Sequence, residues 1–475
     1  MFCLNNILHG WWTSSLDVNL RYNGGRSLLY IAGLNGNLTA AAKLLYMGGD
    51  ISAQGGKYGN ALQSAVWGGN EAIVHLLLDR GANVNAQGGE YCDALRAAAA
   101  KGSQSIVRLL LDRGADINAQ GGRIGEALQV AAEKGSEGVV RLLLDRGADV
   151  NAQGGLFGNA LQAAAWSSSE GVVRLMLDRG ANVNAQGGSY GNALQAAAWN
   201  SSEGVVRLML DRGADINAQG GSLYNALHAA SLRGNEGVVR LLLDRGADIN
   251  AQGDRVDSAL QAAAWGDSES VFHLLLDRGA DINAQNGEFG GALYIAASAT
   301  NEAYVRLLLD RGADVNAKGG EYGNALQAAA EIGSEDVVRL LLDRGADINS
   351  QGGIYGNALQ AAAGKGSESV VRLLLDRGAD VNAQGGIYGN ALQAAAGKGS
   401  ESVVRLLLDW GAAINAYGGR YGNALQAAAH RCNRVLVRLL LDQGASINAQ
   451  GGNFGNALQA AISSDSSDKI LSVFC

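Results

Sequence analysis

An Ala-Leu step recurs every 33 residues along most of this 475-residue chain, without insertion or deletion. The steps begin at Ala61, Ala94, Ala127, Ala160, Ala193, Ala226, Ala259, Ala292, Ala325, Ala358, Ala391, Ala424 and Ala457. A fixed period of this length, with two short helical patterns in each repeat, is typical of proteins that stack one structural unit. The sequence therefore predicts one elongated all-α array, although its length alone would suggest about three globular domains.

The first helix of each repeat is predicted from its capping residues, as residues 357–386 illustrate. Asn357 is a suitable N-cap, and Gln360 stands where its side chain can bond back to the N-cap backbone. The helix is expected to begin at Ala358 and to be broken by Gly364 and Gly366. A run of alanines keeps it thin enough for neighbouring helices to approach closely.

The second helix is expected to begin after Ser367 as its capping residue and to end at Gly378, which can adopt the left-handed conformation. Val and Leu side chains between 370 and 375 form an apolar face too wide for a helix that packs on one side only. Glu368 and Arg372 can pair on the solvent side. Both helices are shorter than the ~12–15 residues that an isolated helix needs in water, so stability must come from stacking.

The order Ala-Leu-Gln-x-Ala-Ala, Gly, Val-Val-Arg-Leu-Leu-Leu, Gly-Ala-Asp-x-Asn-Ala is similar to the ankyrin repeat over about residues 17–475. The resemblance implies an ankyrin-repeat α-solenoid of about 14 stacked helix-turn-helix repeats with intervening hairpin loops. Where that family usually has Thr-Pro-Leu-His, most repeats here have Asn-Ala-Leu-Gln, and only His228 restores the histidine. The form Gly-Gly-x-Tyr-Gly-Asn-Ala-Leu-Gln resembles the variant found in fungal arrays, many of which follow a NACHT-type NTPase.

The repeat register divides the chain into four parts. Residues 1–23 are expected to hold an N-terminal segment with a decayed half-repeat, 24–56 a divergent capping repeat with a second helix from Thr39 to Tyr46, 57–452 twelve ankyrin-like repeats, and 453–475 a truncated capping repeat. In the last part, Ala457 to Ile462 is predicted as a first helix and Asp465 to Cys475 as a more polar second helix. Trp11 and Trp12 either pack on the first repeat or contact a partner.

Composition and charge argue against several classes of function. The net charge of −8 and the pI near 5.3 disfavour a general nucleic-acid or anionic-membrane surface, and no apolar run reaches the ~18 residues of a membrane helix. The four cysteines lack metal-ligand or disulfide spacing. The start of the chain lacks a positively charged secretion signal. We therefore expect an intracellular, most simply cytoplasmic, monomer.

The sequence predicts no enzyme activity, no cofactor and no metal site. It contains no phosphate-binding loop of the Gly-x-x-x-x-Gly-Lys type, and its Gly-Gly pairs recur in loops. His75 and His273 replace an outward arginine of the second helix, His228 takes a capping position, and His9 and His430 stand alone. The carboxylates are copied from repeat to repeat, whereas catalysis needs a unique constellation.

The positions that vary most are the two residues after the alanine run, at the end of the first helix. In the ankyrin family these positions and the hairpin tips face the concave groove where partner proteins bind. Trp166, Trp199, Leu232 and Trp265 fall on four successive repeats and predict a continuous apolar strip, beside which Arg233 and Arg255 can make polar contacts. The full set of predicted partner-binding residues is Trp67, Trp166, Trp199, Leu232, Arg233, Trp265 and the basic row of Lys365, Lys398 and Arg431.

Other interpretations of these positions stay open. The tryptophans can pack against one another or the neighbouring helix, and shared residues can record recent duplication, since Gln351 to Asp376 is identical to Gln384 to Asp409. The basic row can be a solvated face or can suit an acidic segment, and the regular hairpin aromatics are assigned to packing. The predicted function is a non-enzymatic scaffold that binds a partner protein in the groove. The alternatives are the ligand-sensing array of a NACHT-type (STAND) receptor whose NTPase lies outside this chain, and an enzyme.

Overall fold

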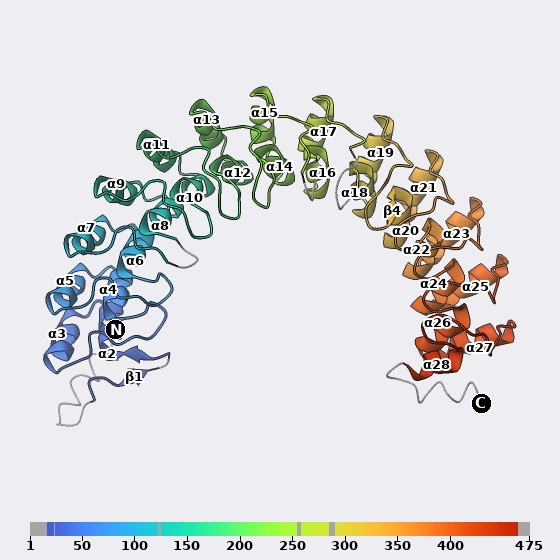
Figure 1. Ribbon diagram of the computed structural model, residues 1–475, viewed down its shortest axis with the longest axis horizontal. Helices are drawn as coiled ribbons and strands as arrows, with labels where there is room; N and C mark the ends of the chain where they lie inside the picture. Colours follow the sequence, from blue (N-terminus) through green and yellow to red (C-terminus); the bar gives the residue numbers. More distant parts are fainter. Residues whose placement is uncertain (1–16, 23, 122–124, 254–257, 285–289, 464–475) are drawn as a thin grey trace. The chain divides into compact units, whose positions relative to one another are not determined.

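A computed structural model gives the fold and describes residues 17–22, 24–121, 125–253, 258–284 and 290–463. The chain divides into an N-terminal stack, Met1–Ala247, and a C-terminal stack, Asp248–Cys475. Within each stack the even-numbered helices form one layer and the odd-numbered helices a second layer beside it (Figure 1). The predicted Asp465–Cys475 helix and the two tryptophans at positions 11 and 12 lie outside the described residues.

The N-terminal stack alternates a first and a second helix of each repeat. Its first helices are α2 (Leu28–Asn35), α4 (Ala61–Gly68), α6 (Ala94–Lys101), α8 (Ala127–Glu133), α10 (Ala160–Trp166), α12 (Ala193–Trp199) and α14 (Ala226–Leu232). Its second helices are α3 (Leu38–Tyr46), α5 (Glu71–Asp79), α7 (Gln104–Asp112), α9 (Glu137–Asp145), α11 (Glu170–Asp178), α13 (Glu203–Asp211) and α15 (Glu236–Asp244). The strands β1 (Arg21–Tyr22) and β2 (Arg26–Ser27) pair antiparallel before α2.

The C-terminal stack follows the same order. Its first helices are α16 (Ala259–Trp265), α18 (Ala292–Ser298), α20 (Ala325–Ile332), α22 (Ala358–Lys365), α24 (Ala391–Lys398), α26 (Ala424–His430) and α28 (Ala457–Ile462). Its second helices are α17 (Glu269–Asp277), α19 (Glu302–Asp310), α21 (Glu335–Asp343), α23 (Glu368–Asp376), α25 (Glu401–Asp409) and α27 (Arg434–Asp442). The strands β3 (Lys318–Gly319) and β4 (Gly323–Asn324) pair antiparallel before α20.

The predicted start of the first helix is confirmed at α22, but its end differs. Asn357 accepts a hydrogen bond from the backbone N–H of Gln360, and the Gln360 side chain accepts one from the backbone N–H of Asn357. The helix continues through Gly364 to Lys365 and stops at Gly366, whose φ is +86°. Gly364 therefore does not break the helix, because one helical glycine costs only about 1 kcal/mol and packing by neighbouring helices outweighs this cost.

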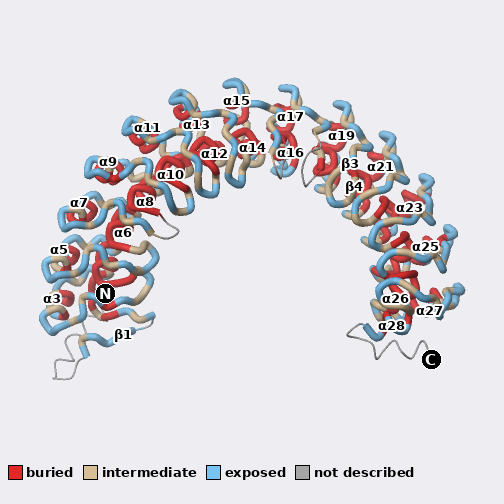
Figure 2. Tube along the Cα trace, in the orientation of Figure 1, coloured by how far each residue is buried: buried red, intermediate tan, exposed pale blue. Residues whose placement is uncertain are grey.

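The second helix confirms the predicted packing and corrects the predicted cap. All the Val and Leu side chains of α23 are buried, and Arg372 pairs with Glu368 at 2.9 Å. Ser367 occupies the N-cap position but makes no side-chain capping bond; its hydroxyl lies beside Gly333 of the preceding repeat instead. Buried residues gather in the helices and exposed residues at the turns (Figure 2).

The hairpin loop before α24 approaches the preceding hairpin so closely that glycine is required at position 386. A Cβ placed on Gly386 would lie 2.1 Å from the carbonyl carbon of Tyr355, and the φ of Gly386 is +59°. Gly385 and Gly389 then close the hairpin through a backbone bridge. The predicted role of these glycines as turn residues is confirmed.

The capping glutamines also bind the next repeat, which the sequence pattern did not indicate. The Gln360 amide nitrogen donates to the carbonyls of Ala383 and Gly389, both at 3.1 Å, in the hairpin that precedes α24. The same side chain thus starts one helix and holds the loop of the following repeat. These hydrogen bonds offset the free-energy cost of burying the amide group of Gln360.

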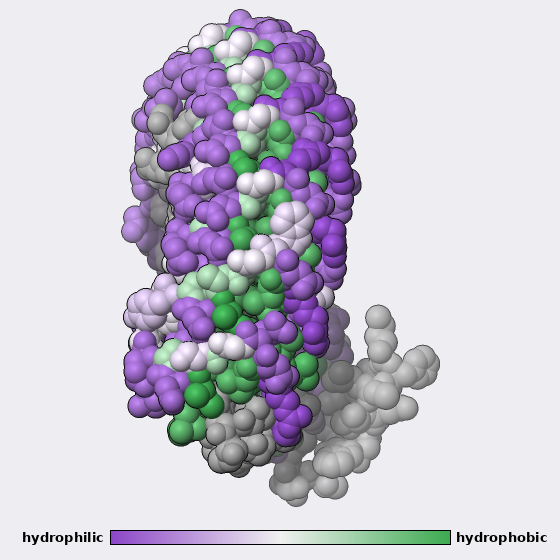
Figure 3. All heavy atoms as spheres, turned by 90° about the vertical axis from the view of Figure 1, so that its right-hand side faces the viewer, coloured by the Kyte–Doolittle hydropathy of each residue, from purple (hydrophilic) through white to green (hydrophobic). Residues whose placement is uncertain are grey.

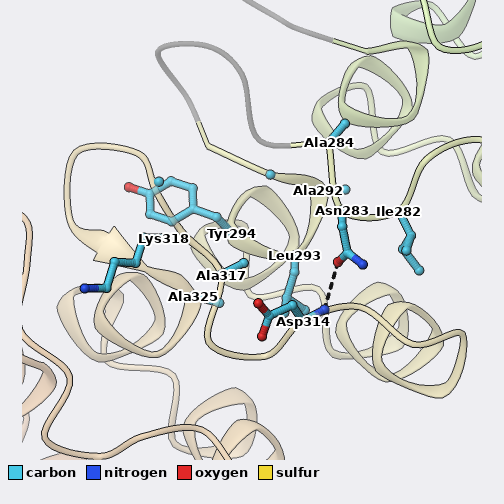
Figure 4. Close-up of a pocket in the computed structure, with 12 residues that line it drawn as sticks. Ile282, Asn283, Ala284, Ala292, Leu293, Tyr294, Asp314, Ala317, Lys318 and Ala325 are labelled. Atoms are coloured by element: carbon cyan, nitrogen blue, oxygen red, sulfur yellow. Dashed lines mark hydrogen bonds between the residues drawn. The ribbon is translucent and has the colours of Figure 1, made fainter.

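A second inter-repeat connection runs through the asparagine of the Asp-x-Asn sequence. Asn283 accepts from the backbone N–H of Asp314 at 2.8 Å, as the dashed line in Figure 4 shows. Asn382 accepts from the N–H of Ala413 at 2.7 Å and donates to the carbonyl of Gly411 at 3.2 Å. Neighbouring repeats of the C-terminal stack are therefore bonded to one another at a fixed sequence offset.

Copied charges on the second helices neutralise one another. Arg344 at the end of α21 pairs with Asp310 of the preceding repeat, and Arg377 pairs with Asp343, both at 2.8 Å. Trp410 takes the arginine position after α25 and is 45% exposed. One face of the molecule is mostly hydrophilic, with a narrow column of apolar residues running through it (Figure 3).

Thr300 carries local backbone strain that a single substitution should relieve. Its φ is +57°, in the left-handed region that a β-branched residue rarely adopts, whereas the corresponding position after α22 is Gly366. We expect Thr300→Gly to stabilise the protein by about 1 kcal/mol, measured by urea denaturation. The reverse exchange, Gly366→Thr, serves as the matched control and should destabilise. A Thr300→Gly protein that is less stable than the wild type would contradict the expectation.

Candidate functional site

Aromatic side chains of successive hairpins stack in the C-terminal stack. Tyr322, Tyr355, Tyr388, Tyr421 and Phe454 form what we call the aromatic column, with successive ring centroids 5.8, 5.9, 6.2 and 6.1 Å apart. The prediction that the hairpin aromatics serve packing is confirmed by these contacts. Successive rings of the column therefore lie 5.8 to 6.2 Å apart along this face.

Two of the predicted binding tryptophans lie between hairpin rings in the N-terminal stack. The Trp67 ring stands 4.9 Å from Tyr58 and 4.8 Å from Tyr91. The Trp166 ring stands 4.6 Å from Tyr190 and 6.0 Å from Phe157. Both tryptophans are half-buried. This arrangement favours packing as the role of Trp67 and Trp166.

Further along the N-terminal stack, the helix ends are more open. The Arg233 guanidinium lies over the Trp199 ring, 5.0 Å from its centroid, and is itself exposed. Trp199 and Leu232 are half-buried at the ends of α12 and α14. A cation that covers one face of an indole leaves its edge for other contacts.

Trp265, the fourth member of the predicted strip, belongs to the C-terminal stack. It ends α16, and its side chain is 54% exposed. The other three members lie in the N-terminal stack, so the continuity of the strip across the two stacks stays a prediction. Within its own stack, Trp265 is the predicted binding residue with the largest apolar surface open to solvent.

The predicted basic row lies together in the C-terminal stack. Lys365 and Lys398 are the last residues of α22 and α24, and Arg431 follows α26; all three are exposed. The stem of Lys398 lies against Gly366, and the Arg431 Nε donates to the carbonyl of Gly397 at 2.6 Å. Lys398 and Arg431 therefore each contact the end of the preceding even-numbered helix.

The charges of this row are unlike those of the second helices. Arg339, Arg372 and Arg405 each bond a glutamate one turn earlier. Within the described residues, no ion pair is formed by Lys365, Lys398 or Arg431, whose side chains stay exposed. A row of cations that forms no ion pair within the described part of the chain, on a protein of negative net charge, is available to an anionic ligand.

Two further residues belong to this surface: Arg420, which the sequence analysis did not identify, and Glu331, which occupies one of the variable helix-end positions. Arg420 lies over the rings of Tyr388 and Tyr421, at 5.3 and 4.6 Å, and adds a cation beside the aromatic column. Glu331, half-buried at the end of α20, lies near Lys365 and Lys398 and bonds Tyr355. Burial raises the pKa of Glu331, while the Tyr355 bond and the two lysines oppose this shift. Burial, followed by the Glu331 charge, raises the pKa of Tyr355.

The histidines and cysteines do not form a reactive cluster in the described part of the chain. His430, expected to stand alone, lies between Tyr421 and Phe454, with centroids at 5.6 and 4.4 Å. His228 keeps its predicted place next to the cap, where its Nδ1 lies 2.8 Å from the Asn225 side chain. Cys92 and Cys432 are half-buried cysteines. The described residues contain no group of three His, Cys, Asp or Glu side chains arranged as metal ligands.

The cavities are small or open. The cavity of about 10 Å³ near Leu293, Tyr294 and Asp314 has room for roughly one water molecule (Figure 4). A broad open depression between α17 and α19 is lined by side chains that include His273, Glu302 and Arg306. Across the described ranges, none of the helices is long and apolar enough to cross a membrane.

Comparison with known families gives one consistent result. The family model described as Ankyrin repeats (3 copies) matches residues 87–154, 219–286, 259–352 and 353–418, which together make up more than half of the chain. The model described as Ankyrin repeat matches residues 60–89, 159–188, 192–221 and 423–452. A search of the curated proteins returned no match.

Proposed function

The chain belongs to the ankyrin-repeat family, and from this premise we propose that it is a non-enzymatic scaffold that binds a partner protein at the ends of its even-numbered helices. Ankyrin repeats generally mediate protein–protein interaction, and proteins built from them are generally not enzymes. The repeat fold thus serves as a scaffold, and the side chains that differ between repeats determine what the protein binds.

One observation carries this proposal. The side chains that vary between repeats lie exposed or half-exposed at the ends of the even-numbered helices, as Trp265 and Lys398 do. The charges copied along the odd-numbered helices mostly form ion pairs with one another, as Arg344 and Asp310 do. A recognition surface is expected to have exposed side chains that differ from repeat to repeat. The paired charges of the odd-numbered helices instead form a solvated surface that is the same in most repeats.

The apolar part of the proposed surface consists of Trp199 and Leu232 in the N-terminal stack, where Arg233 lies over the Trp199 ring, and of Trp265 in the C-terminal stack. Trp and Arg side chains carry much of the binding energy in protein interfaces. Trp67 and Trp166 contribute to the same edge chiefly by packing between hairpin rings. They are therefore poor positions for testing binding, because their loss would also disturb the hairpins.

The test uses the triple variant Leu232→Ser, Arg233→Ser and Trp265→Ser. We expect its capture of specific proteins from a native cell extract to fall at least roughly tenfold, because interface anchors are lost. Circular dichroism should show unchanged helix content. Trp410→Ser is the matched control, since it removes a tryptophan of similar exposure, 45% against 54%, from an odd-numbered helix. Equal capture by the wild type and the triple variant would refute the apolar surface.

The narrower hypothesis, that the array senses ligands for a NACHT-type receptor, rests on the resemblance of the Gly-Gly-x-Tyr-Gly-Asn-Ala-Leu-Gln form to fungal arrays. It specifies the same binding surface and adds a signalling NTPase as a partner or fused domain. Recovery of a P-loop NTPase in the capture experiment would favour it over a free scaffold.

A further inference from the structure

We propose that the basic row of Lys365, Lys398 and Arg431 binds an extended acidic segment of a partner protein, with carboxylates at alternate residues of that segment. The inference rests on the proposed function and specifies the chemistry of one partner. It concerns the C-terminal stack alone, where the row and the aromatic column are described together.

The first argument is charge. Lys365, Lys398 and Arg431 are exposed, and Arg420 adds a fourth cation over the rings of Tyr388 and Tyr421. The chain as a whole carries a net charge of −8, so an acidic segment is repelled in general and attracted only where cations are concentrated. This local attraction favours a short acidic segment over a large polyanion such as nucleic acid, which would also meet the acidic surface around the row.

The second argument is spacing. Successive rings of the aromatic column beside the row are 5.8 to 6.2 Å apart. Alternate side chains of an extended peptide point the same way and are separated by about 6.6–6.8 Å. Three carboxylates at every second residue can therefore face three successive repeats, within the reach of flexible lysine and arginine side chains.

A helical segment is the nearest competitor, since every fourth residue of an α-helix also repeats at about 6 Å. It would need nine residues to present three carboxylates, and a helix of that length does not form by itself in water. An extended segment of five residues meets the same three cations without that nucleation cost. We therefore assign the extended form.

Glu331 fixes where the acidic segment begins. It stands in the last turn of α20, one repeat before the α22 repeat that carries Lys365. A ligand carboxylate placed one repeat further in that direction would meet this group instead of a cation. The segment is therefore aligned from the α22 repeat to the α26 repeat, with Arg420 beside the middle of it.

The test measures binding of fluorescent peptides to the full chain by anisotropy. The probe is Gly-Glu-Thr-Glu-Thr-Glu-Gly, and its isomer Gly-Glu-Glu-Glu-Thr-Thr-Gly has the same composition and charge. A longer peptide with glutamates at every fourth position represents the helical alternative. We expect the alternating peptide to bind at least about tenfold more tightly than either of the others, and its binding to weaken with salt.

Protein variants complete the test. Lys365→Glu with Lys398→Glu should reduce binding of the alternating peptide at least about tenfold, and it leaves the Arg431 bond to Gly397 in place. Arg108→Glu with Arg438→Glu is the matched control, because both arginines are exposed on odd-numbered helices and the change in net charge is the same. The control should bind like the wild type.

The outcomes separate this inference from the proposed function. Equal binding of the two isomers, tighter binding of the helical peptide, or equal losses in both variants would overturn the inference. Absence of any peptide binding would also overturn the inference. In that case the capture experiment with the triple variant would still test the proposed function independently. If the wild type and the triple variant captured proteins equally but the alternating peptide bound as expected, the apolar surface would be refuted and the acidic-segment site would be supported.

Discussion

Replacing Arg96 by alanine should destabilise the protein by about 3–5 kcal/mol, the largest effect that we expect from one substitution. Arg96 stands where most repeats have the capping glutamine, and its side chain is 1% exposed. It pairs with Asp93 at 2.9 Å and donates to the carbonyls of Gly121 and Ala119. Its removal would leave a buried carboxylate and two partly buried carbonyls without these donors.

The measurement is chemical denaturation, with the double variant Asp93→Asn and Arg96→Gln as its control. This pair of substitutions restores the Asn-Ala-Leu-Gln form of the other repeats, where Gln360 makes the equivalent bonds to the next hairpin. We expect the double variant to be at least as stable as the wild type, because an uncharged hydrogen-bonded pair avoids the cost of burying two charges. A stability loss below about 1 kcal/mol for Arg96→Ala would contradict the argument.

Raising the pH should weaken the protein through Glu126, with a total effect of about 3 kcal/mol. Glu126 is buried at the N-cap of α8, where it makes no side-chain capping bond. Burial, and then the charge of Asp149, raises its pKa from 4.5 to about 7, while Arg96 opposes the shift. The folded state binds this proton more tightly than the unfolded state does. The contribution of Glu126 to the free energy of unfolding is therefore fully present below pH 4.5 and is lost as the pH rises through 7.

Glu126→Gln isolates this effect, because the amide cannot titrate. We expect the wild type and the variant to be similarly stable near about pH 4.5, and the variant to be the more stable by about 3 kcal/mol near pH 8. Denaturation curves of both proteins across this range give the difference directly, since all other titrating groups cancel. Parallel pH profiles would show that Glu126 is an ordinary carboxyl.

Local signals in the sequence predicted the helices well. The cap at Asn357, the ends at Gly366 and Gly378, and the second helix at Glu368–Asp376 follow from chemistry within one repeat. The missing cap bond of Ser367 was not predictable in this way, because the position of its hydroxyl depends on the preceding repeat. The exact number of repeats, expected to be about 14, stays a prediction.

The candidate site was predictable only in part, for a related reason. The variable positions identified Lys365 and Lys398 as exposed cations, since nothing in their own repeat pairs with them. The position of Trp166 between Phe157 and Tyr190 depends on how closely two hairpins approach, and the ring of the next repeat decides it. The pKa of Glu331 likewise depends on residues of later repeats, Tyr355, Lys365 and Lys398.

The asparagine and glutamine bonds between repeats have a consequence for how such a chain changes over generations. Every one of them joins positions at a constant offset, as from Asn382 to Ala413 and from Gln360 to Gly389. A gene that gains or loses whole 33-residue copies therefore recreates the same bonds at the new junction. Near-identical copies such as 351–376 and 384–409 are what unequal recombination would leave. Array length and surface composition can thus evolve separately, with the surface rewritten at a few helix-end positions.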